Sequence, residues 1–135
     1  MGYSVLDFRR RRASGFGGVT TDFVWTVATT GSDETFTIPC QNVGVFNATV
    51  DWGDGSTSAI TAYNDADLAH TYASAGDHQI RISGTLPNIY FNNAGDKLKV
   101  KSVENLGVVG WSMLDQAFRG CSNMTSFLAG NTDTS

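Results

Sequence analysis

The sequence is poor in cysteine and histidine and has no long apolar run, and each shortage excludes a class of protein. The two cysteines alone are too few for a structural zinc site, and His70 and His78 do not supply recognisable metal-ligand spacing. We interpret Cys40 and Cys121 as small buried apolar side chains, with a disulfide as the alternative. No apolar run approaches the roughly 20 residues that a membrane-spanning helix needs, so we expect no membrane partner.

The composition predicts a folded all-β protein. Hydrophobic residues make up 41% of the chain and charged residues 16%, which is typical of a globular domain. Threonine, valine, serine and aromatic residues are frequent, whereas helix-favouring residues are sparse. A net charge of -4 disfavours a nucleic-acid-binding surface. The stretch 1–9 has no apolar segment behind its basic cluster, so we expect no secretory signal peptide.

Residues 1–22 differ from the rest of the chain. Four consecutive arginines adjoin the glycine-rich stretch 13–18, and such a segment buries too little apolar surface to fold alone. We predict an extended N-terminal arm that docks on an acidic or multi-subunit protein surface. Its predicted contact residues are Tyr3, Leu6, Phe8, Arg9, Arg10, Arg11, Arg12 and Phe16. A solvated leader sequence is one alternative, and binding of the arginines to nucleic-acid phosphates is another.

Residues 23–104 alternate between apolar and polar side chains in short runs separated by turn signals. A period of two is typical of strands that bury one face. The predicted strands are 23–29, 34–40, 46–52, 57–62, 68–72, 78–84 and 97–103, the last with its lysines facing water. Seven or eight short strands with regular turns predict an antiparallel β-sandwich.

The most distinctive stretch is Asp51-Trp52-Gly53-Asp54-Gly55, where a strand ends in a glycine-rich turn. Glycine adopts positive φ without steric cost, and aspartate accepts hydrogen bonds from nearby backbone amides. We therefore interpret both aspartates as braces of the chain reversal.

Residues 105–135 show another pattern. Met113, Leu114, Ala117 and Phe118 have the spacing of one helix face, and Gly120 follows where a helix would end. We predict a short helix over 113–119. The polar tail after Leu128 has no hydrophobic face with which to close a domain, so this region resembles the start of a further unit.

The glycine-rich turn and the residues downstream of it resemble the PKD domain family. The resemblance rests on the Trp-Gly-Asp-Gly turn at 52–55, then on His70, Tyr72 and Gly76 in the family's order and approximate spacing. It implies an immunoglobulin-like sandwich over residues 23–104, with Trp52 in the core. By the same resemblance, Tyr72 is a corner residue whose hydroxyl meets the backbone, and His70 fixes a loop.

Residues 111–125 resemble the first unit of a BspA-type leucine-rich repeat. Trp111-Ser112-Met113 and the stretch 117–125 match that family's motif, with Met124 in place of leucine. The resemblance implies that 105–135 begin a repeat array, which the stretch 88–96 links to the sandwich. Such repeats normally come in series, because one unit cannot bury its own hydrophobic face. Further sequence or another subunit would complete the array.

Three candidate sites compete with structural interpretations. Five aspartates (51, 54, 65, 67 and 77) are candidates for a Ca²⁺ site, but no aspartate-rich calcium loop is present, so we expect no cofactor. Trp52 and Tyr72 are candidates for a carbohydrate platform, but core packing is favoured. His70 beside Asp67 or Asp77 suggests acid–base chemistry, yet no nucleophile motif accompanies it, so we predict no enzyme.

These features lead to three functional hypotheses. The favoured one is a non-enzymatic virion structural protein, such as a phage head decoration, fibre or tail component. Its arm docks on other virion subunits, and its sandwich is displayed, in a homo-oligomer, toward a host-surface protein or glycan. The alternative is a bacterial cell-surface adhesin of the PKD plus leucine-rich-repeat type. The third is a carbohydrate- or protein-binding module of a secreted hydrolase.

Overall fold

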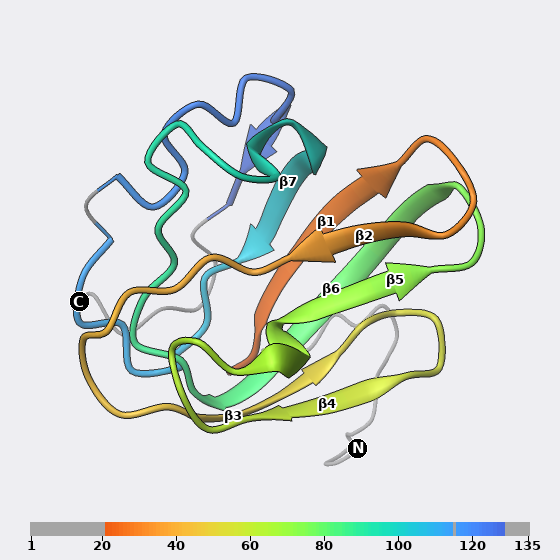
Figure 1. The fold of residues 1–135 in the computed structure, drawn as a ribbon. Coiled ribbons are helices and arrows are strands. Elements are labelled where there is room, and N and C mark those ends of the chain that lie inside the picture. The colour runs from red at the N-terminus through yellow and green to blue at the C-terminus, as the bar shows by residue number, and fades with distance from the viewer. Residues whose placement is uncertain (1–20, 115, 129–135) are drawn as a thin grey trace, which may run out of the picture.

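The computed structural model describes residues 21–114 and 116–128 as two β-sheets with two single-turn 3₁₀ helices (Figure 1). The all-β prediction is confirmed. The strands are β1 (Phe23–Thr29), β2 (Glu34–Thr37), β3 (Asn47–Asp51), β4 (Thr57–Ile60), β5 (Ala69–Tyr72), β6 (Gly76–Thr85), β7 (Val100–Asn105) and β8 (Ser126–Phe127). The 3₁₀ helices are η1 (Ala66–Leu68) and η2 (Lys97–Lys99). No helix in the described residues is long and apolar enough to cross a membrane.

The larger sheet has six strands in the order β4-β3-β6-β1-β7-β8, and β2 pairs with β5 in the smaller sheet. The small sheet lies across one face of the large one (Figure 1). Among the named strands of the described residues, the pairings are antiparallel except for that of β7 with β8, which is parallel. The large sheet therefore changes from antiparallel to parallel pairing at its β8 edge.

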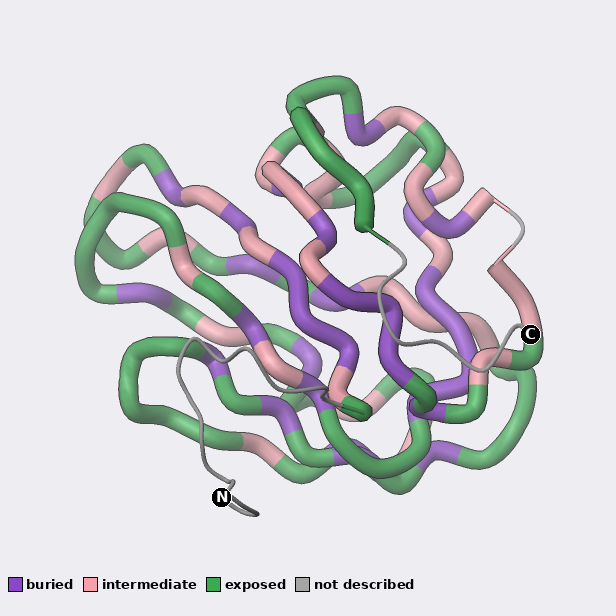
Figure 2. The backbone as a smooth tube through the Cα atoms, turned by 180° about the vertical axis from the view of Figure 1, so that it is seen from behind, coloured by how far each residue is buried: buried purple, intermediate pink, exposed green. Residues whose placement is uncertain are grey.

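Alternation of side chains explains which face of each strand is buried. In β6, Ile80 and Ile82 are fully buried while Gln79 is exposed, and in β3, Ala48 and Val50 point inward. Buried residues consequently run through the middle of the molecule, and the turns at its ends are exposed (Figure 2). Burial of alternate apolar side chains is the main favourable term in folding these strands.

The core is continuous from the strands of the two sheets into the C-terminal segment. Trp25 of β1 packs edge-on against Phe36 of β2, with ring centroids 5.4 Å apart, and against Phe118 at 6.3 Å. Phe23 also contacts Trp111 at 5.0 Å. One set of aromatic rings therefore joins both sheets to residues 111–118.

The predicted helix over 113–119 is wrong. Met113 forms an isolated parallel bridge with Asn88, and residues 116–120 form turns. Gln116 has φ of +58°, which a right-handed helix does not accommodate. The carbonyls of Gln116 and Ala117 accept hydrogen bonds from the amides of residues 92 and 91, instead of bonding within a helix. Tertiary pairing therefore overrides the helical apolar spacing.

The prediction that the lysines of 97–103 face water was also incomplete. Lys99 does not simply face water, because its Nζ donates to the Thr35 carbonyl at 2.6 Å. The same ammonium lies 3.3 Å from Glu34 and 3.2 Å from Asp96. These contacts fasten η2 to β2, an association that the alternation of the sequence did not indicate.

Candidate functional site

The glycine-rich turn is held by its own side chains. The Gly53 amide donates to Asp51 Oδ1 at 3.0 Å, and the Ser56 amide donates to Asp54 Oδ1 at 3.1 Å. The Trp52 amide closes the loop by donating to the Ser56 carbonyl at 3.0 Å. Both aspartates therefore serve as acceptors for backbone amides of the turn.

Four rings form a ladder behind this turn. Trp52 stacks on His70 with centroids 4.8 Å apart, His70 meets Tyr72 edge-on at 4.8 Å, and Tyr72 stacks on His78 at 3.7 Å. The Tyr72 hydroxyl donates to the Trp52 carbonyl at 2.8 Å in a buried setting. The ladder, defined as these four residues, ties β3, β5 and β6 together.

Polar atoms of the ladder are also paired. His70 Nε2 lies 2.8 Å from Asp54 Oδ2, Trp52 Nε1 donates to Ser58 Oγ at 2.9 Å, and His78 Nε2 lies 3.0 Å from the Thr29 hydroxyl. Partial burial alone would raise the pKa of Asp54, but hydrogen bonds from His70 and from the Ser56 amide hold it below its usual value.

These contacts give the ladder a structural role. Burial raises the pKa of Tyr72 above its ordinary value, and its hydroxyl is committed to a carbonyl, so it is a poor acid or nucleophile. Ser58 Oγ accepts a hydrogen bond from Trp52 Nε1. The pair His70–Asp54 fixes the turn to β5.

The predicted site residues fall into two groups. Asp51, Trp52, Gly53, Asp54, Gly55, His70 and Tyr72 meet at the turn and the ladder, and Gly76 begins β6 with φ of +138°. The predicted docking-arm residues Tyr3 to Phe16 lie outside the described residues.

The five aspartates considered for Ca²⁺ do not converge. Asp65 is instead the N-cap of η1, where its oxygens accept from the amides of Asp67 and Thr61 at 3.0 Å. These amide hydrogen bonds lower the pKa of Asp65. Within the described residues, no three His, Cys, Asp or Glu side chains are grouped so that they could hold a metal ion.

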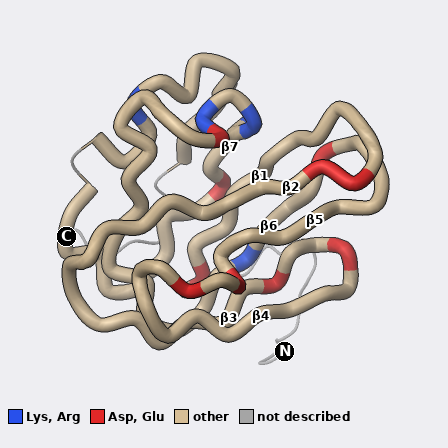
Figure 3. The backbone as a smooth tube through the Cα atoms, viewed as in Figure 1, with Lys and Arg blue, Asp and Glu red and all other residues tan. Residues whose placement is uncertain are grey.

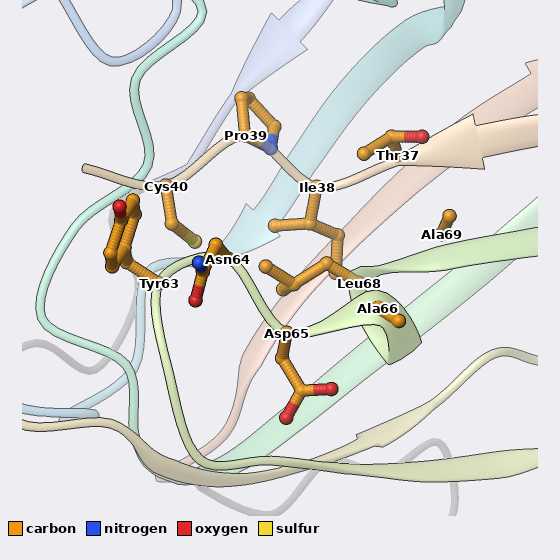
Figure 4. A pocket seen from close by; sticks show the side chains of 10 residues that line it. All are labelled: Thr37, Ile38, Pro39, Cys40, Tyr63, Asn64, Asp65, Ala66, Leu68 and Ala69. Carbon is orange, nitrogen blue, oxygen red and sulfur yellow. The ribbon is translucent and has the colours of Figure 1, made fainter. Parts of the chain in front are cut away.

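A shallow hollow of about 380 Å³ opens beside the loop that follows β4 (Figure 4). Its walls are Thr37, Ile38, Pro39, Cys40, Tyr63, Asn64, Asp65, Ala66, Leu68 and Ala69. Burial raises the pKa of the Cys40 thiol to about 12, so the thiol is unreactive at neutral pH. The hollow therefore offers apolar contact beside the polar side chains of Thr37, Asn64 and Asp65, and its thiol is not a nucleophile.

The sequence did not predict the role of Asn88, which follows β6 and bonds to the segment 41–43. Its side chain is fully buried, with Oδ1 accepting from the Gln41 amide at 2.7 Å and Nδ2 donating to the Val43 carbonyl at 2.9 Å. A buried amide satisfied in this way fixes two loops in one arrangement. No sequence signal distinguishes it from the exposed asparagines nearby.

Comparisons with protein-family models, with curated proteins and with solved structures found no significant match to this chain.

Proposed function

We propose that this chain is a non-enzymatic structural protein of a virus particle, such as a phage head decoration, fibre or tail component. Residues 1–22 anchor it on neighbouring subunits, and the β-sandwich projects for adhesion or for stabilisation of the particle. Its partners are other virion subunits, further copies of itself, and a protein or glycan on the host surface.

The observation that carries this proposal is the internal pairing of the groups best suited to chemistry. Asp54 is bonded to His70 and to the turn, and the Tyr72 hydroxyl is bonded to a buried carbonyl. A catalytic group must reach a substrate with a free donor, acceptor or nucleophile. The donors and acceptors of these side chains are already bonded within the protein. This favours a scaffold that works by binding.

Charge distribution supports docking through the N-terminal segment. Four of the nine basic residues are Arg9 to Arg12, which leaves five basic against eleven acidic residues in 23–135. Acidic residues are spread over the sandwich, whereas the lysines gather beside β7 (Figure 3). A cationic segment is complementary to such an acidic surface on a neighbouring subunit, including another copy of this chain.

We further propose that the sandwich is immunoglobulin-like and of the PKD type. Antiparallel pairing in both sheets and the bond from the Tyr72 hydroxyl to the Trp52 backbone support this assignment. Such sandwiches carry their ligand contacts on loops at the ends, where sequence change leaves the core intact.

A bacterial cell-surface adhesin of the PKD plus leucine-rich-repeat type is the second candidate function. The observation that favours it is the parallel pairing of β7 with β8, in which Ser102 faces Ser126. Parallel pairing at an offset of 24 residues is the geometry of stacked repeats, which often present extended binding surfaces.

Deleting residues 1–18 tests the docking function. We expect loss of particle association while near-ultraviolet circular dichroism of the buried tryptophans stays unchanged, because Trp25 and Trp52 lie in the core. Replacing Arg9 to Arg12 with glutamine, at full length, separates the charge from the length of the segment. Incorporation of the truncated protein at wild-type occupancy would rule out anchoring by this segment.

A further inference from the structure

The large sheet has an open edge at β4. β4 is the last strand on that side and, within the described residues, pairs only with β3. The Ser56 carbonyl accepts from the Trp52 amide at 3.0 Å, so residue 56 turns its backbone groups toward the β3 side. Successive residues of an antiparallel strand turn these groups to opposite sides, so the N–H and C=O groups of Thr57 and Ala59 face outward. In the described part of the chain they have no partner.

The outer edge of β2 shows how this protein covers a strand edge elsewhere. The Thr37 amide donates to Asp96 Oδ2 at 2.8 Å, and the Thr35 carbonyl accepts from Lys99 Nζ at 2.6 Å. Charged side chains thus occupy the outward backbone groups of β2. The stretch 55–62 around β4, by contrast, contains no charged residue and no proline, which are common protections of an edge strand.

The side chains around the β4 edge carry charge of one sign. Residues 47–72, which contain β3, β4, η1 and β5, include four aspartates and no lysine or arginine. Asp65 and Asp67 come shortly after the Ile60 end of β4. Hydrogen bonds from the amides of Thr61 and Asp67 hold the pKa of Asp65 below its usual value, so this carboxylate is charged at neutral pH. An uncharged edge therefore leads directly to a pair of carboxylates.

A segment with the matching order of side chains lies outside the described residues. Residues 3–8 include Tyr3, Val5 and Phe8, which favour strands. Arg9 to Arg12 follow them directly. Along the chain the segment is thus largely apolar and then cationic, while β4 and the residues after it are uncharged and then anionic. The opposite charges meet if the segment runs parallel to β4.

The length of the chain before β1 allows this segment to reach β4 of the same copy. Cross-strand pairing places one residue of each strand in a common row across the sheet: Phe23, Ile82, Val50 and Ser58. Thr21 therefore lies toward the Ile60 end of β4, three strand spacings or roughly 14 Å away. The stretch 13–20 spans up to roughly 26 Å when extended, which covers that distance. From Arg12 back to Tyr3 the chain then runs from Ile60 toward Thr57, which makes it parallel to β4.

We propose that in the free protein residues 3–12 pair in parallel with β4 of the same chain and form a seventh strand of the large sheet. The outward N–H and C=O groups of β4 then bond to the added strand, and Arg9 to Arg12 lie beside Asp65 and Asp67. The chain's own segment is favoured over that of a second copy, because its linker holds it at an effective concentration of about millimolar. The contact covers both the open edge and the arginines. Its release, which rests on the proposed anchoring, comes when neighbouring virion subunits take up the segment.

Amide hydrogen exchange of the free full-length protein, read residue by residue by NMR, tests this pairing. We expect the amides of Thr57 and Ala59 to exchange about tenfold or more slowly than in the chain that lacks residues 1–18. Ala59→Pro removes only an outward donor, which an edge strand tolerates, and should return the Thr57 amide to the rate of the truncated chain. The amides of Ser58 and Ile60, which face β3, should stay protected in all three proteins and report an intact sheet. Equal Thr57 exchange with and without residues 1–18 would overturn the proposal.

Charge variants and protein concentration identify the occupant. Asp67→Asn should speed exchange of the Thr57 amide by about threefold, whereas Asp33→Asn, the same change of charge in the turn between β1 and β2, should leave it unchanged. Equal effects of the two variants would contradict the placement of the arginines. Protection that rises with protein concentration, together with a dimer in analytical ultracentrifugation, would overturn the assignment to the same chain. These measurements contain no virus particles, so their failure is separate from a failure of the truncated protein to lose particle association.

Discussion

At the scale of single residues, the hydroxyl of Tyr72 is the most constrained polar group of the ladder. It is buried and donates to the Trp52 carbonyl, which is itself in the core. Tyr72→Phe leaves that carbonyl unpaired and should lower the free energy of unfolding by about 1–3 kcal/mol in urea denaturation. The control is Tyr63→Phe, at a side chain that is 37% exposed, where we expect a change within about 0.5 kcal/mol. Equal effects of the two variants would contradict the role of Tyr72.

Acid should weaken the protein through Asp54 and Asp65, whose pKa values are both lowered in the folded state. The unfolded chain binds protons more readily at these carboxyls. Their contribution to stability is therefore complete above their ordinary pKa of 3.8 and is lost as the pH falls through the lower folded value. We expect the urea midpoint to drop below about pH 4, and Asp54→Asn to show a smaller drop. An unchanged acid limb in Asp54→Asn would contradict this assignment.

The roles of the turn residues could be predicted because their hydrogen bonds and backbone angles are local. Aspartates accept from amides two residues away, as Asp51 does from Gly53, and glycines take positive φ. Asn88 and Lys99 could not be predicted in the same way, since their partners lie 47 and 64 residues away. Long-range partners leave no mark in a local pattern.

At the scale of elements, Gly53 and Gly55 form a matched pair within one turn. Both have positive φ, +86° and +93°, but a Cβ on Gly53 would lie 2.4 Å from the Gln79 carbonyl oxygen, whereas Gly55 has nothing within 4 Å. Gly55→Ala should cost about 1–2 kcal/mol from backbone strain alone. Gly53→Ala should cost at least about 1 kcal/mol more, because β3 must move away from β6. Similar unfolding midpoints for the two variants would show that the close approach is unimportant.

Most strand positions could be predicted from the alternation of apolar and polar residues. That alternation could not exclude a helix over 113–119. The strands predicted at 23–29 and 57–62 correspond to β1 and β4. Residues 113–119 have helical apolar spacing, yet their carbonyls at 116 and 117 accept hydrogen bonds from the amides of residues 92 and 91. Propensity is a weak prior, and pairing with a neighbouring segment overrides it.

At the scale of the whole molecule, the shared aromatic core should make the described part of the chain unfold as one unit. The ring centroid of Phe118 lies 6.3 Å from that of Trp25 in β1 and 5.6 Å from that of Phe127 in β8. Phe118→Ala should lower the stability by about 3 kcal/mol or somewhat less, given its partial burial. The loss should appear in a single transition that tryptophan fluorescence and far-ultraviolet circular dichroism report alike. A separate early transition, with strands β1 to β6 unaffected, would contradict a common core.

At this scale, the internally paired groups of the ladder and the cationic N-terminal sequence are the grounds for our proposal of a displayed, non-enzymatic virion protein. The most direct measurement is quantitative mass spectrometry of virus particles purified by density gradient from a culture that carries this gene. Residence in the virion predicts the chain at a constant ratio to the major capsid protein across the particle peak. Recovery of the chain only in the cell-surface fraction, with none in the particle peak, would contradict residence in the virion and favour the adhesin.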